Sequence, residues 1–151
     1  MTQRTDDTGK LLLRLGIGGL MFFHGLAKLR DNSFVEETVI NAGLPAWAAY
    51  GVFVGEVIAP LLLMVGLFTR TAAMLVMADM VAAILLVHTG DVTRLTPTGG
   101  LAIELPMLFL LGAATIALVG PGRFAVAWNP MRDLVTPREP IGARARTAAG
   151  R

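Results

Sequence analysis

Seven ionisable residues lie within or at the edges of the long apolar stretches of this sequence. They are Arg14, His24, Lys28, Glu56, Asp79, His88 and Glu104. A charged side chain at the centre of a bilayer costs about 2.5–3.5 kcal/mol on insertion scales, so such residues usually face a bundle interior and mark a functional site. Histidine and glutamate can exchange protons, and lysine can stabilise developing negative charge. The residue types therefore indicate proton-transfer or ligand-binding chemistry inside a membrane.

The composition is that of an integral membrane protein. Hydrophobic residues make up 54% of the 151 residues, charged residues only 16%, and the mean hydropathy is +0.64. Four apolar stretches have the length of a membrane span, at residues 11–29, 46–68, 71–87 and 101–119. Their continuous apolar character favours helices over the alternating strands of a barrel. The sequence predicts an all-α fold, an integral membrane four-helix bundle.

The segments around this bundle differ in composition. We expect residues 1–9 to be a polar, frayed N-terminus, residues 10–128 to form the membrane domain, and residues 129–151 to form a basic tail that is disordered from about residue 137. In the loop at 30–45, hydrophobic residues recur at helical spacing. This pattern predicts a short amphipathic helix on the outer surface. After the fourth span, Trp128 is expected to anchor a short segment at the membrane interface.

The basic residues predict the orientation. Of the 13 lysines and arginines, ten fall on the side that holds both termini, and three, Lys28, Arg30 and Arg94, fall on the other. This bias predicts a multi-pass protein of the plasma membrane with both termini in the cytoplasm. Because the basic residues lie at membrane boundaries and in the tail, the expected partner of this charge is the lipid bilayer and not nucleic acid.

Helical periodicity places the ionisable residues of the first span on one face. We expect this face to look into the bundle; it consists of Arg14, Ile17, Gly18, Met21, His24, Gly25 and Lys28. In the second span, Glu56 lies near the middle. Pro60, four residues later, is expected either to disturb the helix beside this carboxylate or to be a simple packing kink.

Depth along the spans separates the seven residues. At a rise of about 1.5 Å per residue, His24 and Lys28 lie in the outer half, Glu104 and His88 lie at the outer end, and Glu56 and Asp79 lie nearer the midplane. We expect an outward-opening pocket in which Lys28 or His24 neutralises Glu56 or Glu104. His24 and Glu56 are the predicted catalytic residues. The predicted ligand-binding residues are Lys28, Glu104, Gly25 and His88.

Arg14 lies in the inner quarter of its span. It is expected to form a structural ion pair with Asp79, although Arg14 could instead reach the inner headgroups and Asp79 could instead bond internally. The other charged residues could likewise be structural pairs that determine which helices meet. No metal, haem or nucleotide site is predicted. The chain has no cysteine, its two histidines lie on separate helices, and it lacks a glycine-rich phosphate loop.

Several motifs resemble the DoxX family of bacterial inner-membrane proteins. They are Glu56 and the sequences LRLG (13–16), FHGLAKL (23–29), GLFTR (66–70), ELP (104–106) and GPGRF (120–124). The residues of this sequence that match motif positions of the family are Arg14, His24, Gly25, Lys28, Glu56, Arg70 and Glu104. The segment after GPGR departs from the family pattern because it lacks an aspartate, so no role is carried over to it. The resemblance implies four membrane helices, and some relatives are linked to quinone-dependent or oxidative-stress complexes.

The predicted function is that of a membrane subunit of a redox or oxidative-stress complex, with a quinone-like apolar ligand bound in the bundle. If the protein is an enzyme, we expect a subunit of a quinone-linked oxidoreductase whose electrons come from soluble partners at the cytoplasmic face. Two alternatives stay open. One is a non-catalytic membrane anchor that recruits soluble partners through its basic tail. The other is a small transporter or proton pathway, which would need broken helices.

Overall fold

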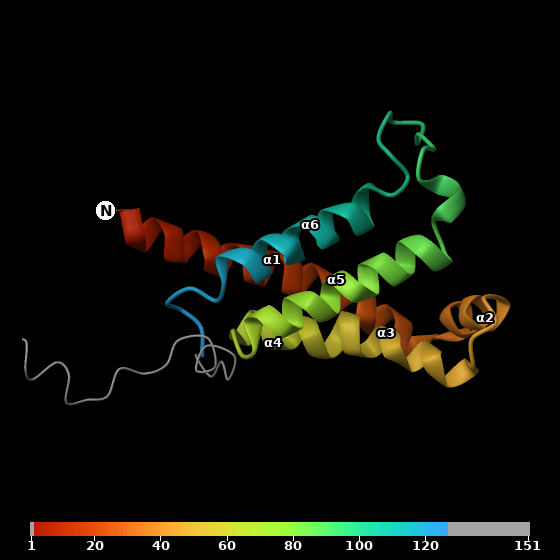
Figure 1. Ribbon diagram of the computed structural model, residues 1–151, viewed down its shortest axis with the longest axis horizontal. Helices are drawn as coiled ribbons and strands as arrows, with labels where there is room; N and C mark the ends of the chain where they lie inside the picture. The colour runs from red at the N-terminus through yellow and green to blue at the C-terminus, as the bar shows by residue number, and fades with distance from the viewer. Residues whose placement is uncertain (1, 127–151) are drawn as a thin grey trace, which may run out of the picture.

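The computed structural model describes residues 2–126, and its regular secondary structure over this range is entirely helical (Figure 1). The predicted basic tail at 129–151 and Trp128 lie outside the described residues. In chain order the elements are α1 (Thr2–Arg30), α2 (Ser33–Asn41), η1 (Ala46–Tyr50), α3 (Gly51–Phe53), η2 (Val54–Ile58), α4 (Ala59–Val65), α5 (Thr69–Leu86), η3 (Thr89–Asp91) and α6 (Glu104–Val119).

Within residues 2–126, four helical rods form the bundle, which confirms the predicted fold class. The first rod is α1, and the second is the continuous run from η1 through α4. The third rod is α5, and the fourth is α6. In Figure 1 these rods lie lengthwise along one another; α5 packs mainly against α6, and α1 mainly against α4. Met21, Leu63, Val76, Phe109 and Ile116 belong to the buried core between them. Many other large apolar side chains remain exposed on the outside, as expected for a surface that faces lipid.

In the part of the chain that the structure describes, three rods are long and apolar enough to cross a membrane, at Arg4–Arg30, Ala46–Val65 and Thr69–Leu86. The fourth predicted span is shorter than expected, because α6 has 16 residues and begins at Glu104. Leu101 lies in the turn before α6, where its N–H donates to the Glu104 carboxylate at 3.0 Å. The second rod also ends earlier than predicted. Gly66, with φ of 82°, closes it in the left-handed conformation that glycine adopts without strain.

The amphipathic helix predicted in the first loop is confirmed as α2. Val39 on its inner face is buried, and Phe34 and Ile40 are exposed. The helix ends before Gly43, whose φ of 77° reverses the chain toward Pro45 and the second rod. Figure 1 shows α2 beside the start of that rod, at the end of the bundle away from the N-terminus.

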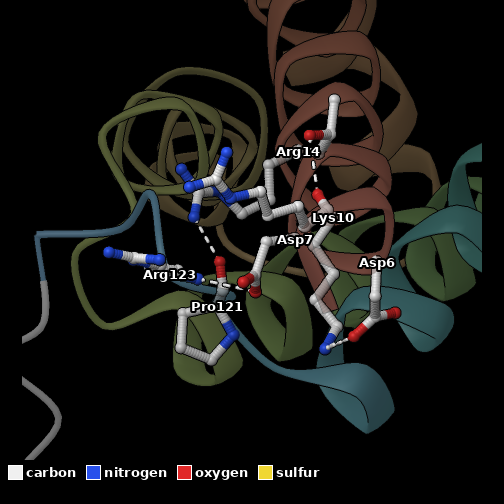
Figure 2. Close-up of polar contacts among 8 residues, drawn as sticks. Asp6, Asp7, Lys10, Arg14, Pro121 and Arg123 are labelled. Atoms are coloured by element: carbon white, nitrogen blue, oxygen red, sulfur yellow. Dashed lines mark hydrogen bonds and ion pairs between the residues drawn. The ribbon is translucent and has the colours of Figure 1, made fainter. Parts of the chain in front are cut away.

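The prediction that residues 1–9 are frayed is wrong for the described part, because α1 begins at Thr2. Lys10 and Asp6 form an ion pair at 2.6 Å one helical turn apart. Asp7 accepts the backbone N–H of Arg123 at 3.0 Å (Figure 2). The polar start of the chain is thus held as helix by local pairing and by the segment that follows α6.

Candidate functional site

The second rod has a π-helical turn at Val54–Ile58. Pro60 has no N–H, so it cannot donate the usual hydrogen bond to the carbonyl of Glu56, four residues earlier. A π turn widens the helix by one residue and is often found at functional sites. Gly55 and Glu56 are both buried in this turn. The disturbance predicted beside the carboxylate is therefore a local change of helix type.

Gly25 brings α1 into contact with this turn. A Cβ atom at position 25 would collide with the backbone carbonyl of Glu56 and would lie 2.6 Å from Cγ2 of Val57. Only a residue without a side chain permits this approach. One helical turn further along α1, Lys28 reaches Glu56, and its Nζ lies 2.5 Å from Oε1. The sequence left open whether Lys28 or His24 neutralises Glu56 or Glu104, and the structure shows the pair of Lys28 with Glu56.

Asp79 joins these two residues from α5. A Cβ atom at position 55 would lie 2.5 Å from Cγ of Asp79, so the aspartate packs directly against Gly55. Oε2 of Glu56 and Oδ2 of Asp79 are both buried without a hydrogen-bond partner among the described residues. The side chain of Glu56 is 4% exposed and that of Lys28 is 31% exposed. One ammonium group and two carboxyl groups thus meet where α1, η2 and α5 pack together.

These three residues line a cavity of about 350 Å³ that is partly open at the surface. The lining otherwise consists mainly of apolar side chains from α2, the second rod and α5, including Phe34, Val39, Val52, Leu75 and Leu86. Cavities of about 300–1,000 Å³ with an apolar lining and a few polar groups are typical of small-molecule sites. The arrangement can hold an apolar ring and exchange hydrogen bonds or protons with it.

His24 and Glu104, predicted to belong to the same pocket, lie outside this cavity. His24 is exposed at the edge of the buried face of α1, where its ring contacts Phe109 of α6 edge-on at 5.7 Å between centroids. Glu104 is exposed and accepts the N–H of Leu101. The side chains of residues 24 and 28 point about 40° apart around the axis of α1. Because α1 packs against both the second rod and α6, Lys28 reaches the second rod and His24 reaches α6.

His88 also lies outside the cavity lining, although it was predicted as a ligand-binding residue. It follows the end of α5, and its Nδ1 lies 3.8 Å from Oδ2 of Asp91 in the next turn. Gly25 contributes by permitting helix contact, as described above, and does not itself line the cavity.

The predicted ion pair between Arg14 and Asp79 is wrong. Arg14 is buried at 1% exposure and donates to four backbone carbonyls, which belong to Leu63, Met64, Pro121 and Phe124. Figure 2 shows its guanidinium directed at the segment after α6. The carbonyls at the end of α4 have no partner within the helix, and the five N–H groups of arginine suit such a cluster. Arg14 therefore neither pairs with Asp79 nor reaches the headgroups.

Asp79 is the cavity residue whose place the sequence reasoning missed. Its expected depth near mid-span was that of Glu56, but the need to neutralise its charge led to the predicted pairing with Arg14. The available signal was Gly55, the small residue beside Glu56, which lets a side chain from another helix approach that carboxylate.

Comparison with known proteins agrees with the motifs found in the sequence. The profile of the DoxX family matches residues 9–89. A Bacillus subtilis (strain 168) protein named "Putative oxidoreductase CatD" is 32% identical over 117 residues, which are 78% of this chain and 83% of that protein. The chain belongs to the DoxX family. No solved structure matches it. The region of this DoxX-family membrane protein that matches the profile includes Lys28, Glu56 and Asp79 and ends before Glu104.

The ion pair of this DoxX-family protein can be tested by its effect on stability. Lys28→Met leaves the carboxylate of Glu56 buried without its partner, which costs about 3–5 kcal/mol for a fully buried pair. Because Lys28 is partly exposed, we expect a loss of about 2 kcal/mol in the free energy of unfolding. The double variant Lys28→Met/Glu56→Met should recover most of this loss. Unfolding by denaturing detergent, followed by circular dichroism, measures both, and equal instability of the single and double variants would contradict a buried pair.

Proposed function

We propose that this DoxX-family membrane protein binds a quinone-like ring in the cavity between α1, α2, η2 and α5 and serves as the membrane subunit of an oxidoreductase. The observation that carries the proposal is an apolar cavity with Lys28, Glu56 and Asp79 together in its lining. A quinone headgroup is an apolar ring with polar oxygens at its edge, so it matches both parts of the lining. The name of the Bacillus subtilis relative supports the oxidoreductase class.

The residues have distinct roles in this proposal. One N–H of the Lys28 ammonium group donates to Glu56, which leaves others to donate to a ligand carbonyl and to stabilise negative charge on it. Glu56 exchanges protons with the ligand as the carbonyl and hydroxyl forms interconvert. Electrons reach the ring from a soluble partner at the face that holds the termini, which we expect to be cytoplasmic. The setting is the bacterial plasma membrane.

Two other functions were predicted from the sequence. The anchor function depends on the basic tail, which lies outside the described residues. A proton pathway would use the same Glu56 and Asp79, and the π-helical turn is the kind of helix interruption that such proteins contain. A proton pathway needs no ring ligand in the cavity, so ligand binding separates it from the proposed function.

Binding of a short-chain quinone to the full-length protein in lipid nanodiscs tests the proposal by isothermal titration calorimetry. Lys28→Met should weaken binding about tenfold or more, because it removes the charged donor to a quinone carbonyl, and hydrogen bonds that involve charged groups contribute about 1.5–3 kcal/mol. Lys10→Met is the matched control, since Lys10 is a lysine on the same helix that does not line the cavity. Absence of quinone binding to the wild type, or equal binding by Lys28→Met, would contradict the proposed site.

A further inference from the structure

Two buried carboxylate oxygens at the cavity have no hydrogen-bond partner among the described residues. They are Oε2 of Glu56 and Oδ2 of Asp79. Glu56 is nearly inaccessible, with 4% of its side chain exposed, and both residues belong to the cavity lining. A buried acceptor without a partner costs about 1–3 kcal/mol, more when it is charged, and calls for a specific explanation.

No described residue of the protein donates a hydrogen bond to either of these two oxygens. The ammonium group of Lys28 already donates to the other oxygen of Glu56. Asp79 is held against Gly55, so its carboxyl group has little room to turn toward another helix. The neighbouring lining residues Leu75, Ala78 and Ala82 offer no side-chain donor. The unfilled capacity of these two carboxylate groups is therefore the capacity to accept hydrogen bonds.

We propose that the cavity binds the reduced, hydroxyl-bearing form of its ring ligand, a hydroquinone, in preference to the quinone, and that Asp79 and Glu56 accept the hydroxyl hydrogen bonds. This inference rests on the proposed function and specifies the redox form that the site favours. A quinone carbonyl only accepts hydrogen bonds and leaves both carboxylate oxygens unpaired, whereas a hydroquinone hydroxyl donates. Asp79 thereby becomes a ligand-binding residue.

The apolar lining distinguishes this ligand from a simple cation. An alkylammonium ion also brings donors, but one carboxylate is already neutralised by Lys28, and a strongly hydrated charge gains little from the apolar walls. A neutral aromatic diol loses less hydration free energy than an ammonium ion when it leaves water, and it buries its ring against the same walls.

Four probes of equal chain length test the preference in nanodiscs under anaerobic conditions. They are a decyl hydroquinone, the corresponding quinone, the dimethyl ether of the hydroquinone and a decylammonium ion. Hydrogen bonds from a hydroxyl to a carboxylate are strong, so the hydroquinone should bind about tenfold or more tighter than the quinone or the ether. Asp79→Asn, which replaces one acceptor oxygen by an amide N–H₂, should reduce this preference by about tenfold and leave quinone affinity within about twofold.

Each outcome bears on one proposal. Equal binding of hydroquinone and ether, tighter binding of the quinone, or displacement of the hydroquinone by an equimolar amount of decylammonium would overturn the preference while leaving a ring-binding cavity. If none of the ring probes binds, the proposed quinone-binding function itself is contradicted. Asp91→Asn alters an aspartate outside the cavity and should leave the preference unchanged. If Asp79→Asn does not fold, Asp79→Glu, which keeps both acceptor oxygens but moves them, must alter the preference as well.

Discussion

Replacing Arg14 with alanine is expected to lower the free energy of unfolding by about 4–5 kcal/mol, the largest effect of any single substitution considered for this protein. The guanidinium group is buried and donates to four carbonyls, two at the end of α4 and two in the segment after α6. Alanine removes all these donors at once and leaves the carbonyls buried and unpaired. Detergent-induced unfolding monitored by circular dichroism measures the loss.

Two matched variants separate this role from a general effect of charge. Arg14→Lys keeps the charge but cannot reproduce the planar fork, so it should recover less than half of the loss. Arg30→Ala removes an exposed arginine from the other end of α1 and should change stability by less than about 0.5 kcal/mol. Loss of Arg14 should also speed tryptic cleavage after Arg123, because Pro121 and Phe124 lose their anchor. Wild-type stability in Arg14→Ala would show that the carbonyls find other donors.

Replacing Gly25 with alanine is expected to cost about 3 kcal/mol of stability and to disturb the Lys28–Glu56 pair. The added Cβ atom meets the backbone carbonyl of Glu56, and backbone cannot yield as a flexible side chain can. The two helices must therefore separate by the width of a methyl group. Because the cavity is lined by residues of both helices, quinone binding should weaken together with stability.

Gly16→Ala on the same helix is the matched control. No atom lies within 4 Å of a Cβ at position 16, so the substitution should be neutral or should stabilise by about 0.5–1 kcal/mol, through the better helix propensity of alanine. Unfolding and ligand titration of the two variants side by side give the comparison. Equal behaviour of the Gly16 and Gly25 variants would show that α1 does not approach η2 as closely as described.

The buried face of α1 shows how accurately helical periodicity predicted which residues face the bundle. Arg14, Gly18, Met21 and Gly25, all predicted to face the bundle, are buried. His24 was assigned to the same face and is exposed, because it lies at the edge of that face and turns toward α6. Periodicity gives the direction of a side chain to within tens of degrees. It cannot say which neighbouring helix lies there.

The sequence by itself determined that the chain is a helical membrane protein, where the apolar spans lie, that an amphipathic helix follows the first, and that a basic residue of the first span, Lys28 or His24, meets a carboxylate. These properties follow from apolar run length, periodicity and the cost of burying an unpaired charge, all of which act locally along the chain. Only the tertiary structure decided that Asp79 and not Glu104 accompanies Lys28 and Glu56, and that Arg14 binds carbonyls. Those contacts depend on close approaches at Gly25 and Gly55 and on a π-helical turn beside Pro60. Packing between helices sets such approaches, and no single helix contains the information that specifies its neighbours.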